Sequence, residues 1–260
     1  MKTRPAYVAG SFYPSDPDEL RIMVKKYINN VSDSTENENV SCLIVPHAGY
    51  IFSGTTAGYG YKRIQNNNPS RIILLGVSHR YRFEGISLYD GSDFDTPLGT
   101  VMIDIEFSER LADTFPIGGS HPHAHEHTLE TQLPFLQYIL DSIPIVPVLF
   151  GEIANTQHDE FGRCLANLLS PNDLVIASTD FSHFLDEAAA KKIDQCSINA
   201  ILAGDTDVLI RGLHNETCSM CGGAAVVAAL SCANTQKATC RHLLNYSTSA
   251  LASGDYDRVV

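Results

Sequence analysis

Cys42-Leu43-Ile44-Val45-Pro46-His47 is a run of four apolar residues that ends in a proline and a histidine. Similar apolar runs occur further along the chain, each bounded by polar or turn-forming residues, at Ile72 to Leu75, Ile145 to Leu149 and Leu174 to Ala177. Short apolar runs of this kind are typical of parallel strands that are buried on both faces of a sheet. The runs therefore predict the central strands of an α/β protein.

The segments between these runs have the apolar spacing of helices. We predict helices at Asp18 to Ile28, Gly54 to Gln65, Thr128 to Leu140, Gln157 to Leu169, Glu187 to Ala203 and Gly222 to Ala233. Helices between parallel strands form crossover connections that cover both faces of a sheet. Residues 85–103 are expected to form an antiparallel excursion with a turn at residues 96–99. The prediction is an α/β fold, a mainly parallel or mixed central sheet flanked by helices, in a single domain spanning residues 1–260.

The composition excludes several classes of function. Lysine and arginine total 18 against 30 acidic residues, a formal charge of −12, and no basic run forms a stripe, so nucleic acid is not an expected partner. No apolar stretch is long enough to span a membrane or to act as a signal peptide. The seven cysteines are an odd and scattered set, which favours reduced thiols. We expect a cytoplasmic protein that does not insert into a membrane.

Histidines follow three of the predicted strand regions: His47, His79 and His183. One such histidine is more often a structural or solvent-facing imidazole, but three at equivalent positions favour a shared site. In open α/β sheets, ligands bind beyond the carboxyl ends of the strands. Neutral imidazole is the commonest metal ligand, and Asp180 could orient a ring or take a proton. If the strands are neighbours, the imidazoles converge on one crevice.

Six short motifs occur in order along nearly the whole chain. They are Ala9-Gly10-Ser11-Phe12-Tyr13-Pro14, Pro46-His47-Ala48-Gly49-Tyr50, Leu75-Gly76-Val77-Ser78-His79, Glu126-His127-Thr128-Leu129-Glu130, Ser178-Thr179-Asp180-Phe181-Ser182-His183 and Met220-Cys221-Gly222. With these motifs the sequence resembles the Memo family, known in prokaryotes as AmmeMemoRadiSam system protein B. That family is similar to the class III extradiol dioxygenases, so the resemblance implies their fold and a non-haem metal pocket.

The resemblance also implies roles for individual residues. His47 and His79 match the two histidine ligands of the dioxygenases, and Cys221 stands where those enzymes have a carboxylate ligand. His183 matches their acid–base histidine, and with Asp180 it is expected to transfer protons in catalysis. Two imidazoles and a thiolate form a borderline-soft ligand set. We therefore expect one bound metal ion, with iron(II) as the first expectation and copper as the alternative.

His127, Glu130 and Tyr50 are further candidates, expected to line the pocket or to support its ligands. For Glu130 and Glu126 the alternative is a position near a helix N-terminus, where negative charge is favourable. For Tyr50 the alternative is packing in the core. The adjoining tract with His121, His123 and His125 either binds metal or forms an exposed loop.

The segment Cys218-Ser219-Met220-Cys221 leads into the predicted helix at Gly222. A helix N-terminus lowers the pKa of a nearby thiol, so Cys221 is expected to have a lowered pKa. Only two residues separate Cys218 from Cys221. Oxidation is therefore predicted to form a reversible Cys218–Cys221 disulfide that lowers metal uptake.

Two functions are consistent with this sequence. The first is a metal-dependent enzyme with redox or oxygen-dependent chemistry. The second is a non-catalytic binding or adaptor protein that uses the ancestral crevice, as animal relatives described as signalling adaptors suggest. The expected partner is an unknown small molecule or peptide, and the prokaryotic family name implies a functional link to a radical-SAM protein. Metal content and redox turnover would separate the two functions.

Overall fold

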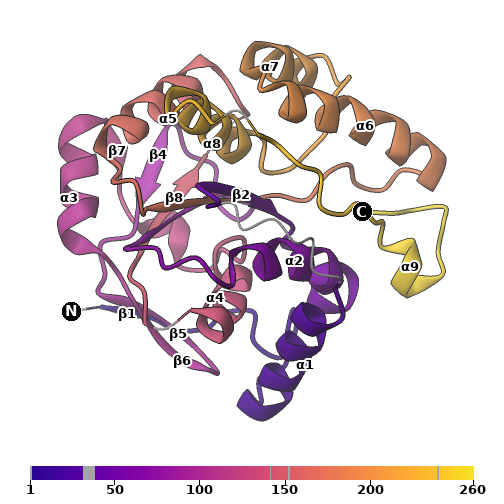
Figure 1. The fold of residues 1–260 in the computed structure, drawn as a ribbon, viewed down its shortest axis with the longest axis horizontal. Coiled ribbons are helices and arrows are strands. Elements are labelled where there is room, and N and C mark those ends of the chain that lie inside the picture. The colour runs from indigo at the N-terminus through magenta and orange to yellow at the C-terminus, as the bar shows by residue number, and fades with distance from the viewer. Residues whose placement is uncertain (1, 32–38, 141, 152, 239) are drawn as a thin grey trace.

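The main sheet interleaves strands from distant parts of the chain (Figure 1). The computed structural model describes residues 2–31, 39–140, 142–151, 153–238 and 240–260. The strand order is β2 (Cys42–Val45), β9 (Leu174–Ser178), β3 (Ile72–Val77), β8 (Ile145–Phe150), β4 (Ile86–Leu88) and β7 (Ile117–Gly118). Neighbours from β2 to β8 are parallel, whereas β4 is antiparallel to β8 and parallel to β7. The predicted α/β fold with a mainly parallel sheet is confirmed.

Helices lie on both sides of this sheet, as Figure 1 shows. They are α1 (Pro17–Asn29), α2 (Tyr50–Ile64), α3 (Ile105–Thr114), α4 (Leu133–Ile139), α5 (Thr156–Leu168), α6 (Glu187–Ala203), α7 (Thr206–His214), α8 (Gly223–Thr235) and α9 (Ala250–Ser253). Short 3₁₀ helices occur at η1 (His121–His123) and η2 (Glu130–Gln132).

Alternate residues of the central strands pack into two layers of core. In β3, Ile73 and Leu75 pack in one layer with residues of α5 and α8, whereas Ile72 and Leu74 pack in the other with residues of α1, α2 and α4. Every residue of β3 and β8 is buried. The strands therefore contribute side chains to both layers, which explains why their sequences are continuous apolar runs.

The helices α5 and α8 approach each other unusually closely. The sequence of α8 is rich in alanine, and its residues from Gly223 to Ala233 are buried. A Cβ atom added to Gly162 of α5 would lie 2.2 Å from the carbonyl oxygen of Ala228 in α8. Only glycine fits at that position, because a side chain would collide with backbone.

Some helix boundaries differ from the predictions. The helix expected from Gly54 begins four residues earlier, at Tyr50, with Gly49 as its N-cap. The helix expected from Thr128 is divided into η2 and α4, with Pro134 in the first turn of α4. Proline is suited to a first turn because it has no N–H to donate. The helices α3, α7 and α9 were not predicted.

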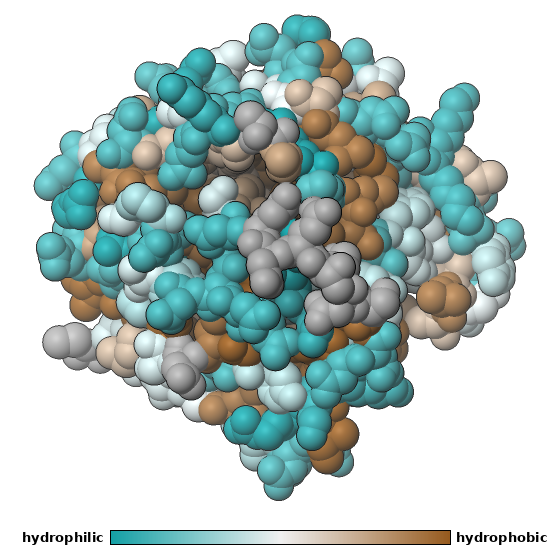
Figure 2. All heavy atoms as spheres, in the orientation of Figure 1, coloured by the Kyte–Doolittle hydropathy of each residue, from teal (hydrophilic) through white to brown (hydrophobic). Residues whose placement is uncertain are grey.

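The predicted antiparallel excursion at residues 85–103 is confirmed as β5 (Asp93–Thr96) and β6 (Gly99–Met102). The N-terminal strand β1 (Thr3–Arg4) pairs in parallel with β5 and carries Arg4 into the interior, where it is 2% exposed. The face of the molecule in Figure 2 is largely hydrophilic, with smaller hydrophobic areas between the polar side chains. Among the described residues, no helix is both long and apolar enough to cross a membrane.

Candidate metal centre

The carboxyl ends of β2, β9 and β3 lie side by side, so the residues that follow them meet at one edge of the sheet. His47, Asp180 and His79 each lie two residues beyond the end of their strand. The ring centroids of His47 and His79 are 5.4 Å apart. The expectation that these strands are neighbours is therefore confirmed.

Hydrogen bonds determine which nitrogen of His47 faces the pocket. Its Nδ1 lies 2.9 Å from Oγ of Ser178, and that hydroxyl donates its proton to the carbonyl of Thr128 at 2.6 Å. The amide of Gln132 also donates to the Ser178 oxygen. Because a hydroxyl has one proton, Nδ1 of His47 must be the donor in its own bond. Nε2 therefore carries the lone pair, 3.2 Å from Sγ of Cys221.

Burial keeps His47 neutral. The residue is 2% exposed, and burial lowers the pKa of its imidazole to about 4 despite the opposing effect of the Asp180 carboxylate. Asp180 accepts a hydrogen bond from the backbone N–H of His47 at 2.8 Å, and its Oδ2 lies 3.7 Å from Nε2. A neutral imidazole with a free Nε2 is the form that ligates metals.

Cys221 lies against the end of β9 because the backbone at Gly222 packs directly on Ser178 and Thr179. A Cβ atom on Gly222 would lie 2.5 Å from the carbonyl oxygen of Ser178, so this position excludes a side chain. The N–H of Gly222 donates to Oγ1 of Thr179 at 2.9 Å, and the N–H of Cys221 donates to the carbonyl of Asp180 at 3.0 Å. Close packing against β9 thus explains the glycine in the Met220-Cys221-Gly222 motif.

The expected lowering of the Cys221 pKa by the helix N-terminus is wrong. Burial raises the pKa of the thiol to about 12, and the nearby Asp180 carboxylate raises it further. These effects outweigh the hydrogen bonds that stabilise the thiolate, including the one from the N–H of Asp180. Without a cation, Cys221 is therefore a thiol, and a metal ion would have to displace its proton.

His79 is held by Glu126, a residue that the sequence interpretation had placed only near a helix N-terminus. The carboxylate of Glu126 accepts from the backbone N–H of His79 at 2.5 Å, and its Oε1 lies 3.2 Å from Nδ1 of the His79 ring. Burial raises the pKa of Glu126, but its contacts with His127 and His79 outweigh burial and hold the pKa below its ordinary value.

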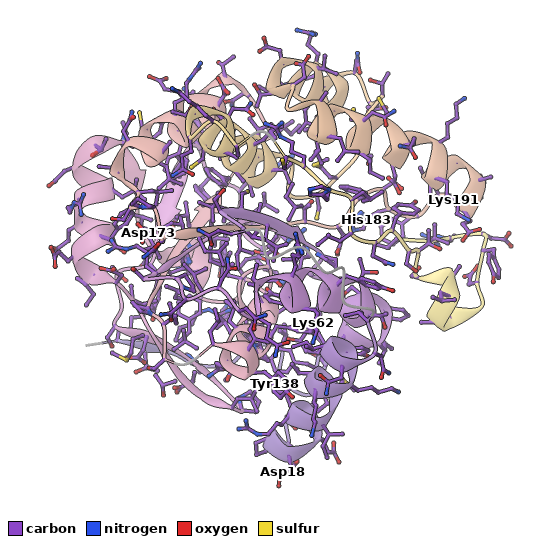
Figure 3. The ribbon with its side chains drawn as sticks, viewed as in Figure 1. Asp18, Lys62, Tyr138, Asp173, His183 and Lys191 are labelled. Carbon is purple, nitrogen blue, oxygen red and sulfur yellow. The ribbon has the colours of Figure 1, made fainter. Side chains whose placement is uncertain are left out.

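Asp180 and His183 lie on the segment that connects β9 to α6, where Figure 3 labels His183. Donor atoms of Asp180, His183 and Cys221 lie within 4.8 Å of one another. Nδ1 of His183 is 2.8 Å from the carbonyl of Phe181, which can only accept, so Nδ1 carries the proton. Nε2 of His183 is therefore the nitrogen that can accept a proton.

Tyr50 and Glu130 make their hydrogen bonds with residues other than the candidate ligands. The Tyr50 hydroxyl donates to the carbonyl of Thr131 at 2.6 Å, and its ring packs against Phe135 in the core. Glu130 is fully buried and accepts from Arg4 at 2.7 Å and from Tyr13 at 2.6 Å. Both residues belong to the packing of the N-terminal segment and of the helices beneath the pocket.

His127 lies beside the pocket, unlike most of the histidine tract before it. Its ring centroid is 4.8 Å from that of His79 and 5.4 Å from that of His47. His121 and His125 are exposed, but His123 is 1% exposed and its Nε2 lies 3.1 Å from the carbonyl of Ser87. The tract is therefore not a uniformly exposed loop, since η1 turns His123 inward.

Cys218 is directed towards a different thiol from the one expected. Its Sγ lies 3.3 Å from Sγ of Cys196 in α6, and Cys218 is 2% exposed. All cysteines of the chain are reduced in the structure. The predicted Cys218–Cys221 pairing has no contact to support it here, because α6 supplies the nearer partner.

The donor set fits a single ion. One ligand atom each from His47, His79 and Cys221 can be chosen so that all lie within 4.8 Å of one another. A second group with the same property consists of His79, Glu126 and His127. Two imidazoles and a thiol are ligands that iron, copper and zinc accept. Sequence reasoning missed Ser178 and Glu126 as supports of the histidines, although both lie inside quoted motifs.

Comparisons with known proteins found similar sequences over nearly the whole chain and a weaker structural match. A family model described as "Memo-like protein" matches residues 4–260. A "MEMO1 family protein" from Aquifex aeolicus is 35% identical over 264 residues, covering 100% of this chain and 97% of the relative. Another from Methanopyrus kandleri is 35% identical over 274 residues, covering 100% and 96%. A solved structure of an uncharacterized protein from Escherichia coli K12 matches with a TM-score of 0.44 and 14% identity, covering 68% of this chain and 81% of that chain.

Proposed function

The chain belongs to the Memo family, and from that premise we propose that it holds one metal ion, iron(II) or copper, on His47, His79 and Cys221 and uses it for redox or oxygen-dependent chemistry. The observation that carries the proposal is the convergence of these donor atoms within 4.8 Å at the carboxyl edge of the sheet. A closed structural zinc site would use four protein ligands, whereas three leave a position for an exogenous ligand. Iron(II) is the first choice and copper the alternative.

The donor chemistry supports a redox metal. A bound iron or copper ion supplies open coordination positions and a change of oxidation state. His47 offers a neutral Nε2 because Ser178 fixes its tautomer. Cys221 gives up its proton on ligation, since only the thiolate binds a metal. The carboxylate of Asp180, 3.7 Å from Nε2 of His47, favours positive charge in the pocket.

His183 and Asp180 are the groups that we assign to proton transfer. Nε2 of His183 is free to accept a proton because Nδ1 donates to the Phe181 carbonyl. Asp180 keeps His47 and Cys221 in place through its carboxylate, its N–H and its carbonyl. A substrate bound at the open coordination position would thus have His183 as a base, on a segment that Asp180 fixes through main-chain hydrogen bonds.

The test is anaerobic calorimetric titration of iron(II) and copper(I) into the wild type, Cys221→Ser, Cys218→Ser and His183→Gln. The wild type should bind one ion, and Cys221→Ser should lose more affinity than the roughly 10–100-fold expected for an outer residue. Cys218→Ser is the matched cysteine control and should bind as the wild type does. His183→Gln should keep the metal while losing proton-coupled turnover.

Equal affinities for the wild type and Cys221→Ser would remove the thiolate from the site. The chain would then be best described as a non-catalytic binding protein for a small molecule or peptide. Elemental analysis of protein purified without oxygen gives an independent measurement, because it reports the ion acquired in the cell.

A further inference from the structure

Glu126 carries a buried carboxylate that is anchored by the main chain on two sides. The residue is 2% exposed. Its Oε2 accepts from the backbone N–H of His79, just beyond β3, and its Oε1 accepts from the backbone N–H groups of His127 at 2.9 Å and Thr128 at 3.2 Å. Three backbone donors from two segments therefore fix the position of the carboxylate.

The same carboxylate also contacts the ring of His79. Oε1 lies 3.2 Å from Nδ1. An ionised carboxylate has no proton to donate, so the proton of this bond belongs to Nδ1. The other nitrogen, Nε2, is left with the free lone pair, as in His47. Nδ1 of His127 lies 3.0 Å from the same oxygen but is not aligned for a hydrogen bond, so the carboxylate fixes the tautomer of His79 alone.

The segment that carries Glu126 is locked onto the end of β3. Oγ1 of Thr128 donates to the carbonyl of Val77 at 3.1 Å. A Cβ atom on Gly76 would lie 2.6 Å from both Thr128 and Leu129, so only glycine lets this segment come so close. On the other side, Arg4 donates to the carbonyl of Glu126 at 2.5 Å. The carboxylate cannot turn away from His79 without breaking these contacts.

We propose that Glu126 is a positioning residue, whose carboxylate holds His79 as the Nδ1–H tautomer and so presents Nε2 to the metal. The inference rests on the proposed function, because it concerns a ligand of that centre. A carboxylate behind a ligating imidazole fixes the ring and makes it a stronger donor, and losing it typically costs about 10–100-fold in metal affinity. In this proposal Glu126 acts through His79 and is not itself a ligand.

The first test uses the metal-free protein and does not depend on metal binding. NMR of protein labelled with ¹⁵N-histidine distinguishes the two tautomers, and His79→Gln assigns the signal. The wild type should show His79 as Nδ1–H. In Glu126→Gln the amide keeps one accepting oxygen where the carboxylate had two, so the ring and the backbone N–H groups compete for it. A mixture with the Nε2–H form is therefore expected. Glu130→Gln removes a buried carboxylate that contacts Arg4 and not His79, so it is the control for loosening of this region: the variant is less stable, but while folded it should leave His79 unchanged.

The second test is anaerobic iron(II) titration of the same variants. Glu126→Gln should bind about 10–100-fold more weakly than the wild type, and Glu130→Gln should bind equally well. An Nε2–H tautomer in the wild type would overturn the inference, as would unchanged tautomer and affinity in Glu126→Gln. Equal weakening in both variants would also overturn it, because the effect would then reflect loosening of the loop. A wild type with the Nδ1–H form that binds no metal would refute the proposed centre and still support the tautomer assignment.

Discussion

Replacing Glu130 by glutamine should destabilise the protein far more than breaking a surface ion pair. Glu130 is fully buried and accepts from the guanidinium of Arg4, from the N–H groups of Tyr7 and Val8, and from the hydroxyl of Tyr13. Glutamine has nearly the same shape but no charge, and it places an NH₂ group against one of these donors. Arg4, 2% exposed, would then be a buried cation without its carboxylate.

Removing one partner of a buried ion pair typically costs about 3–5 kcal/mol. Arg4 also donates to the carbonyls of His123 and Glu126, which favours the lower end of this range. At about 3 kcal/mol per molar urea, a loss of about 3 kcal/mol moves the unfolding midpoint by about 1 M. The exposed pair of Lys191 and Glu187, at 2.8 Å, is the control, and Figure 3 labels Lys191 on α6. Lys191→Met should cost about 0–1 kcal/mol.

The assay is urea unfolding of the wild type, Glu130→Gln, Arg4→Met, the double variant and Lys191→Met. Arg4→Met should be destabilising as well, and the double variant should lose less than the sum of the single variants because the pair acts as a unit. If Glu130→Gln cost no more than Lys191→Met, the buried pair would not be what attaches the N-terminal segment, and the reasoning would be refuted.

Other changes test other parts of the fold. Acid should destabilise the protein because burial lowers the pKa of His123 from 6.5 to about 3. Between these two values the unfolded chain binds one more proton than the folded protein, so the free energy of unfolding rises with pH in that window. In urea unfolding at several pH values, His123→Gln should reduce the slope of this free energy against pH by up to about 1.4 kcal/mol per pH unit. Hydrogen peroxide should oxidise Cys196 and Cys218 to one disulfide, with two waters formed, and peptide mapping should find Cys221 outside it; a Cys218–Cys221 peptide would contradict this. Gly162→Ala should cost about 1–3 kcal/mol through its contact with α8, and no loss in calorimetric unfolding would show that α5 can shift.

The sequence was most informative where burial leaves a strong pattern. Continuous apolar runs marked the central strands, because both faces of β3 and β8 are covered. Their order was not readable, since β9 enters between β2 and β3 from far along the chain. Helices such as α3 and α7 were missed, although Asp104 and Asp205 accept hydrogen bonds as their N-caps. Such caps are single residues, and aspartate is equally common in turns.

The candidate site was predictable as a set of strand-end residues but not as a network. His47 and His79 could be found because they follow apolar runs. The support that Ser178 and Glu126 give them depends on side-chain contacts between segments far apart in the sequence. The same reason explains the error for Cys221, whose position before a helix suggested a lowered pKa while burial raises it. When segments far along the chain bury a residue, the sequence around that residue shows no pattern that predicts it.

The place of β9 between β2 and β3 has a consequence for how the molecule is made. During synthesis, His47 and His79 leave the ribosome long before β9, and Cys221 leaves later still. Until β9 has inserted, nothing holds the first two strands at their final separation, and pairings between distant segments form slowly because chain entropy must be lost first. An ion that meets the growing chain would find isolated imidazoles without their geometry. Loading of the proposed metal centre would therefore be one of the last events in maturation, and a bound ion would mark a chain whose sheet is complete.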